Sequence, residues 1–138
     1  MSGIRNFLLD HSTADYIMFC DADDMFYTNC AILYILCKIN ESEFDCLFPY
    51  YIKEVKNGIA ASYYPNYGCE VHGKVIRRRY LLDNHIRWKE ELITHDSRFF
   101  FALCENCTTK DRIIYDTQPY YIWKDNPNSK TNSSNYYI

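Results

Sequence analysis

The stretch that most constrains this sequence is residues 16–24, where an apolar run ends in three aspartates within four positions. Residues 16–20 are rich in aromatic and aliphatic side chains and stop abruptly at charge, which predicts a strand buried on both faces. Asp21, Asp23 and Asp24 would follow the carboxyl end of that strand, where open α/β sheets bind their ligands. The sequence therefore places a candidate site directly after this strand.

Two interpretations fit these three carboxylates. Close carboxylates repel one another unless a cation compensates them, and hard oxygen ligands of this kind suit Mg²⁺ or Mn²⁺. Aspartate is also common in turns and at helix N-caps for purely local reasons, so a capping turn without any ligand fits the same residues. From this stretch alone the two interpretations are about equally supported.

Composition narrows the class of protein. With 138 residues, 17% of them aromatic, the chain is expected to form one globular domain with a substantial core. The net charge of −3 gives no overall basic field, so nucleic acid is not an expected partner. No run approaches the length of a transmembrane segment, and the amino terminus lacks the apolar core of a signal peptide. Seven cysteines, several in apolar segments, fit a reducing compartment, and we expect a cytoplasmic protein.

Hydrophobic periodicity and turn residues divide the chain into helices and strands. Helices are expected over residues 3–11, 31–40, 78–84 and 95–104. The second helix should be strongly buried, with Thr28 as its N-cap. Strands are expected over residues 16–20, 45–55, 59–64, 71–76, 113–115 and 119–123, and the Asn57-Gly58 turn makes a β-hairpin of the second and third. The expected domain covers residues 1–124, followed by a polar, flexible tail over 125–138.

Four motifs in this order resemble the GT-A glycosyltransferases of family 2. Arg5-Asn6 resembles the Ala-Arg-Asn segment of that family, and residues 14–24 resemble its strand and Asp-x-Asp motif. Residues 73–78 resemble its Gly-Lys-x-x-Arg-Arg segment, and residues 91–100 resemble its Glu-Asp-x-x-Phe region.

The resemblance covers residues 3–124, most of the chain. It implies a truncated or minimal GT-A-like α/β fold, with a mixed sheet flanked by helices and a β-hairpin insertion.

The same resemblance implies inverting transfer of a sugar from a nucleotide-sugar donor to a hydroxyl acceptor such as a saccharide, with Mn²⁺ or Mg²⁺ as cofactor. A divalent ion would stabilise the charge that develops on the leaving nucleoside diphosphate. Asp21 and Asp23 are the implied metal ligands. The implied donor contacts are Arg5, Asn6 and Asp24.

On the acceptor side, the resemblance assigns the general base to Asp96, which would take the proton of the attacking hydroxyl. His95 stands where the family usually has a glutamate before that aspartate, which would alter the surroundings of the base. The remaining candidates, placed at the acceptor side or the diphosphate, are His72, Gly73, Lys74, Arg77 and His95.

The main difference from the family lies at the amino terminus of the chain. Family members begin with a nucleotide-binding βαβ half, and such a unit needs about 30 residues or more. Only 20 residues precede Asp21. We therefore expect the nucleobase-binding half to be missing, so that the chain is a fragment of a split enzyme or a shortened descendant. An exposed sheet edge or apolar face would favour a homo-oligomer or a complementing chain.

Two alternatives to an enzyme fit the sequence. One is a non-catalytic binding or interaction module that keeps a truncated GT-A scaffold. The weaker one is an interaction protein stabilised by zinc, since four residues have the spacing of a Cys₃His set, namely Cys69, His72, Cys104 and Cys107. The run of arginines at 77–79 is read as a solvated basic face rather than a phosphate patch.

Overall fold

A computed structural model describes residues 2–54, 62–64, 70–89, 99, 102, 103, 105 and 112–126. In these residues the helices are α1 (Ser2–His11), α2 (Ala31–Glu41) and α3 (Arg78–Asp83). The strands are β1 (Tyr16–Met18), β2 (Met25–Phe26), β3 (Cys46–Lys53), β4 (Ser62–Tyr64), β5 (Val75–Arg77) and β6 (Ile113–Trp123). None of the described helices is long and apolar enough to cross a bilayer.

The described strands form one mixed sheet in the order β1-β5-β3-β6-β2, with β4 pairing to β3 beside this path. β3 and β6 are parallel along their whole length, whereas the other neighbouring strands are antiparallel. The β3–β4 pair, with Lys53 opposite Ser62, confirms the predicted hairpin. The Asn57-Gly58 turn itself lies outside the described residues. The mixed α/β class predicted from the sequence is thus confirmed.

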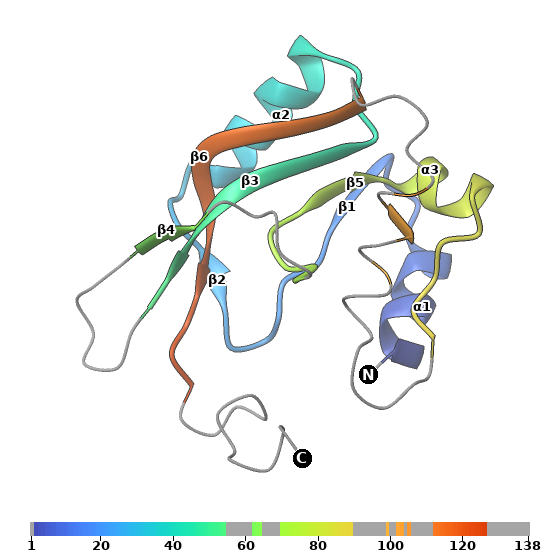
Figure 1. Cartoon of the computed structure of the whole chain (residues 1–138), viewed down its shortest axis with the longest axis horizontal. Helices are drawn as coiled ribbons and strands as arrows, with labels where there is room; N and C mark the ends of the chain where they lie inside the picture. The colour runs from blue at the N-terminus through green and yellow to red at the C-terminus, as the bar shows by residue number, and fades with distance from the viewer. Residues whose placement is uncertain are drawn as a thin grey trace.

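Successive side chains of β3 enter opposite layers, as the two-residue period of a strand requires. Phe48 packs in the layer that holds Leu9 of α1 and Leu81 of α3. Leu47 packs in the other layer, with Ile35 of α2. Figure 1 shows the same division, with α1 and α3 close together and α2 far from both. The hydrophobic core is therefore split by the sheet.

The strand β1 does not match the prediction of burial on both faces. It lies at the edge of the sheet, where it pairs antiparallel with β5 and places Tyr16 opposite Arg77. Its three residues are only half-buried. The prediction is wrong because an apolar run shows only that its side chains favour burial. It does not show whether the strand has neighbouring strands on both sides.

The helix α2 is less buried than its apolar sequence predicts. Only Ala31 and Ile35 are buried, because one narrow face of the helix contacts the sheet. Three apolar residues of the outer face are 48–58% exposed, namely Ile32, Leu33 and Leu36. The predicted N-cap is also wrong, since Cys30 occupies that position and the Thr28 hydroxyl accepts the Cys30 N–H instead, at 3.1 Å.

Two further boundaries differ from the sequence prediction. The strand expected over 71–76 begins only at Val75, because Gly73 has a φ of 73° and forms a turn before it. The two final strands are one continuous strand, β6. It runs through Pro119 where the β3–β6 register shifts, and the missing proline N–H is tolerated at such an irregularity.

Candidate functional site

The three aspartates lie in a turn that we call the acidic loop, residues 21–24. The N–H of Asp24 donates to the carbonyl of Asp21 at 3.0 Å and closes the turn. The loop follows β1 at one edge of the sheet and leads into β2 at the other edge, so the chain crosses the end of the sheet here (Figure 1). This crossing brings the acidic loop to the carboxyl-terminal end of β6.

Asp21 and Asp23 each have a polar partner from another part of the chain. The carboxylate of Asp21 forms an ion pair with Arg5 at 3.1 Å, and its side chain remains 44% exposed. The carboxylate of Asp23 is exposed and accepts a hydrogen bond from the Asn126 amide at 2.6 Å. Among the described residues, no three His, Cys, Asp or Glu side chains gather in a group that could hold a metal.

Asp24 points inward and is fastened to β6 and the residue that follows it. One carboxylate oxygen accepts the Lys124 N–H at 2.8 Å, and the other accepts the Tyr121 hydroxyl. Burial raises the pKa of Asp24 above its ordinary value, although these two hydrogen bonds act in the opposite direction. Both oxygens are engaged, so Asp24 serves here as an anchor of the loop.

Of the two residues on α1 assigned to the donor, only Arg5 reaches the acidic loop. Arg5 is buried, and its guanidinium lies 5.7 Å from the centre of the Trp88 ring while it pairs with Asp21. The Asn6 amide instead donates to the Trp88 carbonyl at 2.8 Å and accepts the Trp88 N–H at 3.1 Å. Asn6 therefore ties the segment before residue 89 to α1.

His72 and Gly73, which the sequence analysis places at the acceptor side or the diphosphate, lie beside the acidic loop. The Gly73 N–H donates to the carbonyl of Phe19 at 3.3 Å, two residues before the loop. The positive φ of Gly73 favours glycine at this position. The His72 ring stacks on Tyr121 at 5.1 Å and meets the edge of Tyr51 at 5.3 Å. These rings form an aromatic wall next to the loop.

Lys74 is placed differently from its neighbours. Its side chain is fully buried, its ammonium donates to the Glu70 carbonyl, and the same ammonium lies 5.1 Å from the centre of the Phe48 ring. Buried in this way, Lys74 stabilises the turn before β5.

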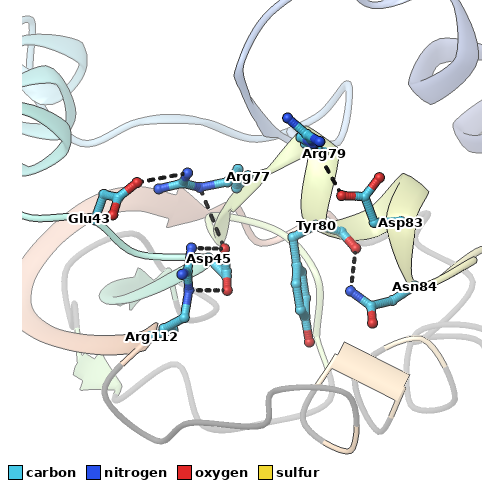
Figure 2. A pocket seen from close by; sticks show the side chains of 8 residues that line it. All are labelled: Glu43, Asp45, Arg77, Arg79, Tyr80, Asp83, Asn84 and Arg112. Carbon is cyan, nitrogen blue, oxygen red and sulfur yellow. Dashed lines mark hydrogen bonds and ion pairs between the residues drawn. The ribbon is translucent and has the colours of Figure 1, made fainter.

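Arg77 lies at the opposite end of β1 from the acidic loop, because it pairs with Tyr16. It lines a pocket of about 420 Å³ (Figure 2). There its guanidinium forms ion pairs with Glu43 at 3.3 Å and with Asp45 at 3.4 Å. The structure therefore does not bring Arg77 to the acidic loop, and the arginines of this pocket are balanced by carboxylates.

The remaining predicted site residues cannot be compared with the structure. His95, Asp96, Cys69, Cys104 and Cys107 lie outside the described residues. The general base and the zinc set therefore stay predictions.

Residues at the end of β6 belong to this site, although sequence reasoning missed them. The apolar run at 119–123 predicts only a strand, but the Tyr121 side chain is fully buried and its hydroxyl is bonded to Asp24. Glu54 holds the residues that follow β6, since its carboxylate accepts the Lys124 ammonium at 2.8 Å and the Asp125 N–H at 3.1 Å. These contacts join residues 70–100 positions apart, so no local pattern signals them.

The Glu54 contacts predict a pH dependence of stability. Hydrogen bonds from Lys124 and from the Asp125 N–H lower the pKa of Glu54 below the ordinary value of 4.5. A carboxyl whose pKa falls on folding stabilises the fold above its unfolded pKa, and this contribution is lost as the pH falls through the folded pKa. We expect Glu54→Gln to lower the Tm at neutral pH, and the difference from wild type to shrink as the pH falls below 4.5. Thermal denaturation across this range measures it.

Glu105→Gln, which changes an exposed glutamate elsewhere in the chain, is the control and should leave the Tm at neutral pH close to that of the wild type. A Tm difference for Glu54→Gln that stays constant from neutral to acid pH would contradict the assignment of this ion pair.

The chain matches no known protein-family model and no curated protein. It is similar to solved structures of TarS from S. aureus. The structure of TarS 1–349 in complex with UDP-GlcNAc has a TM-score of 0.79 at 21% identity, over 97% of this chain and 41% of that chain. The complex with UDP has a TM-score of 0.72 at 22% identity, over 91% and 40%. The fold is a partial GT-A-like fold. The chain spans about two fifths of the length of these TarS chains.

Proposed function

We propose that this chain takes part in inverting glycosyl transfer from a nucleotide-sugar to a hydroxyl acceptor. The observation that carries the proposal is the likeness to TarS chains that hold UDP-GlcNAc and UDP, combined with an acidic loop at the end of β1. At 21–22% identity the similarity to TarS is one of fold. The reaction and the donor are therefore our proposals for this chain.

The residues of the acidic loop fit a divalent cation. Mg²⁺ and Mn²⁺ commonly take one or two protein carboxylates and complete their shell with substrate phosphates and water. Asp21 and Asp23 supply two hard oxygen donors on one turn, both open to solvent. When bound there, the cation would neutralise charge on the leaving diphosphate. Arg5 adds a fixed positive charge next to Asp21.

The proposed reaction needs a base for the acceptor. The acceptor oxygen attacks the anomeric carbon as the bond from that carbon to the diphosphate oxygen breaks, and the nucleoside diphosphate leaves with the bonding electrons. The hydroxyl proton passes to a carboxylate, for which we propose Asp96. Attack from the face opposite the leaving group inverts the anomeric centre.

One observation favours a second candidate, a non-catalytic module on the same scaffold. Each carboxylate of the acidic loop already has a partner within the chain, with Arg5 on Asp21, Asn126 on Asp23, and Tyr121 on Asp24. A protein that had lost metal and donor binding would be expected to satisfy its aspartates in this way.

Calorimetric titration separates the two candidates. Titrating Mn²⁺ and UDP together into wild type should give binding that disappears without Mn²⁺, and Asp23→Ala should weaken it by at least about tenfold. The matched control is Asp83→Ala. Asp83 is an exposed aspartate paired with Arg79, and it lines the pocket of Arg77, away from the acidic loop. Absence of metal-dependent UDP binding in wild type would reject the enzyme in favour of the module.

If binding is present, product analysis with a nucleotide-sugar tests the base. Asp96→Asn is expected to lower turnover by at least about a hundredfold while UDP binding is retained. Unchanged turnover would remove Asp96 from this role.

We further propose a cytoplasmic location. Cys20, Cys30 and Cys37 are free thiols in the described part of the chain, as expected in a reducing compartment.

A further inference from the structure

The end of β6 contacts the acidic loop at each of its aspartates. Tyr121 bonds to Asp21 and Asp24, the Lys124 N–H bonds to Asp24, and the Asn126 amide bonds to Asp23. These contacts differ in character, because Asp23 is exposed and the Tyr121 side chain is fully buried. Tyr121 is therefore the residue among these contacts that belongs to the hydrophobic core.

The Tyr121 hydroxyl joins the two ends of the loop. It accepts the N–H of Asp21 at 3.1 Å and donates to the carboxylate of Asp24. A tyrosine hydroxyl has one proton to donate and lone pairs to accept with, so both contacts form at once. The hydroxyl thereby fixes the main chain at Asp21 relative to the anchor at Asp24.

The Tyr121 ring is itself held in place. It stacks on His72 at 5.1 Å with 14° between the ring planes, and its strand pairs with β3, where Tyr51 lies opposite. Burial and the Asp24 carboxylate raise the pKa of Tyr121 above its ordinary value. The loop is thus positioned by a rigid group of the core, and Asp24 faces inward while Asp21 and Asp23 face outward.

We propose that Tyr121 is the positioning residue of the acidic loop, holding Asp21 and Asp23 in the arrangement that a divalent cation and a nucleoside diphosphate require. The ligand part of this inference rests on the proposed function. The hold of the hydroxyl on the loop does not depend on any ligand and can be measured separately.

The chain contains a matched control in the neighbouring residue. Tyr120 is also buried in β6, and its hydroxyl donates to a different carboxylate, that of Asp116, at 2.6 Å. Tyr121→Phe and Tyr120→Phe therefore each remove one buried hydroxyl that donates to one carboxylate, from adjacent positions of one strand, and Tyr121→Phe also removes the acceptor of the Asp21 N–H. A role limited to stability predicts the same behaviour for both variants, and a positioning role does not.

The experiment compares three measurements on wild type and the two variants, namely the Tm, hydrogen exchange at the Asp21 amide, and the Kd for UDP with Mn²⁺. We expect both variants to lower the Tm, with the larger fall in Tyr121→Phe because it also removes the acceptor of the Asp21 N–H. Exchange at Asp21 should rise about fivefold or more in Tyr121→Phe and stay unchanged in Tyr120→Phe. The Kd should rise about fivefold to tenfold in Tyr121→Phe only.

Exchange at Asp21 that stays at the wild-type rate in Tyr121→Phe would overturn the proposal, and so would equal changes in the two variants. If wild type binds no UDP with Mn²⁺, the proposed function fails while the exchange measurement still decides whether Tyr121 holds the loop. If wild type binds and Tyr121→Phe binds equally well, the positioning role fails and the proposed function remains.

Discussion

Phe48→Ala is expected to lower the free energy of unfolding by about 3–5 kcal/mol and the Tm by roughly 15 °C. The Phe48 side chain is fully buried in β3, within the layer that also holds α1 and α3. Its ring meets the edge of Tyr115 at 5.5 Å and supports the buried Lys74 ammonium at 5.1 Å. Removing the ring leaves a cavity and deprives that ammonium of its aromatic neighbour. Urea denaturation at equilibrium measures the loss.

Two further variants show whether the cavity is the cause. Phe48→Leu keeps most of the volume and should cost about 1 kcal/mol. Tyr115→Ala removes the same ring contact from the other side, but Tyr115 is 55% exposed, so its loss should cost less than Phe48→Ala. Equal losses for Phe48→Ala and Tyr115→Ala would contradict the central place given to Phe48.

Asp45→Ala is expected to cost about 2–3 kcal/mol, with a fall in Tm of roughly 10 °C. The Asp45 side chain is only 9% exposed and pairs with Arg112 at 2.5 Å and with Arg77 at 3.4 Å. Arg77 and Arg112 both contact the Asp45 carboxylate, as Figure 2 shows, so its removal takes away the negative charge that the two guanidiniums share. The Arg112 side chain is 41% exposed, so solvent screens its interaction with Asp45. The expected loss of stability is therefore smaller than for a fully buried ion pair.

The same pocket provides the control for Asp45. Asp83 pairs with Arg79 at 3.2 Å, but the two side chains are 63% and 85% exposed, so Asp83→Ala should cost less than about 0.5 kcal/mol. Asp45→Asn keeps the shape and removes the charge, and should recover only part of the lost stability. A cost for Asp45→Ala no larger than that for Asp83→Ala would show that this buried pair does not stabilise the fold.

Sequence patterns predicted most of the elements because these depend on local spacing. The period of apolar residues identified α1 and α3, and the aromatic run at 45–55 identified β3. The paired strands on either side of Asn57-Gly58 follow from turn chemistry, which is also local. The likeness to TarS agrees with the family resemblance at the level of fold, because the order of elements survives where identity falls to 21%.

Patterns failed where burial depends on neighbours distant in the chain. The run at 16–20 has the composition of a central strand, yet β1 lies at the sheet edge. The helix α2 is apolar on nearly every side, yet only Ala31 and Ile35 are covered within the described residues. Composition records which side chains favour burial, and only the packing of the folded chain decides which of them are covered.

The three aspartates that follow β1 show the same division. The sequence by itself determined that carboxylates follow a strand at the end of a sheet, because strand and turn are set by neighbouring residues. Only the tertiary structure separated their roles, turning Asp24 inward to Tyr121 and leaving Asp21 and Asp23 open to solvent. The physical reason is that the partner of Asp24 lies 97 positions away, brought into contact by the antiparallel pairing of β2 with β6, which places Phe26 opposite Tyr121.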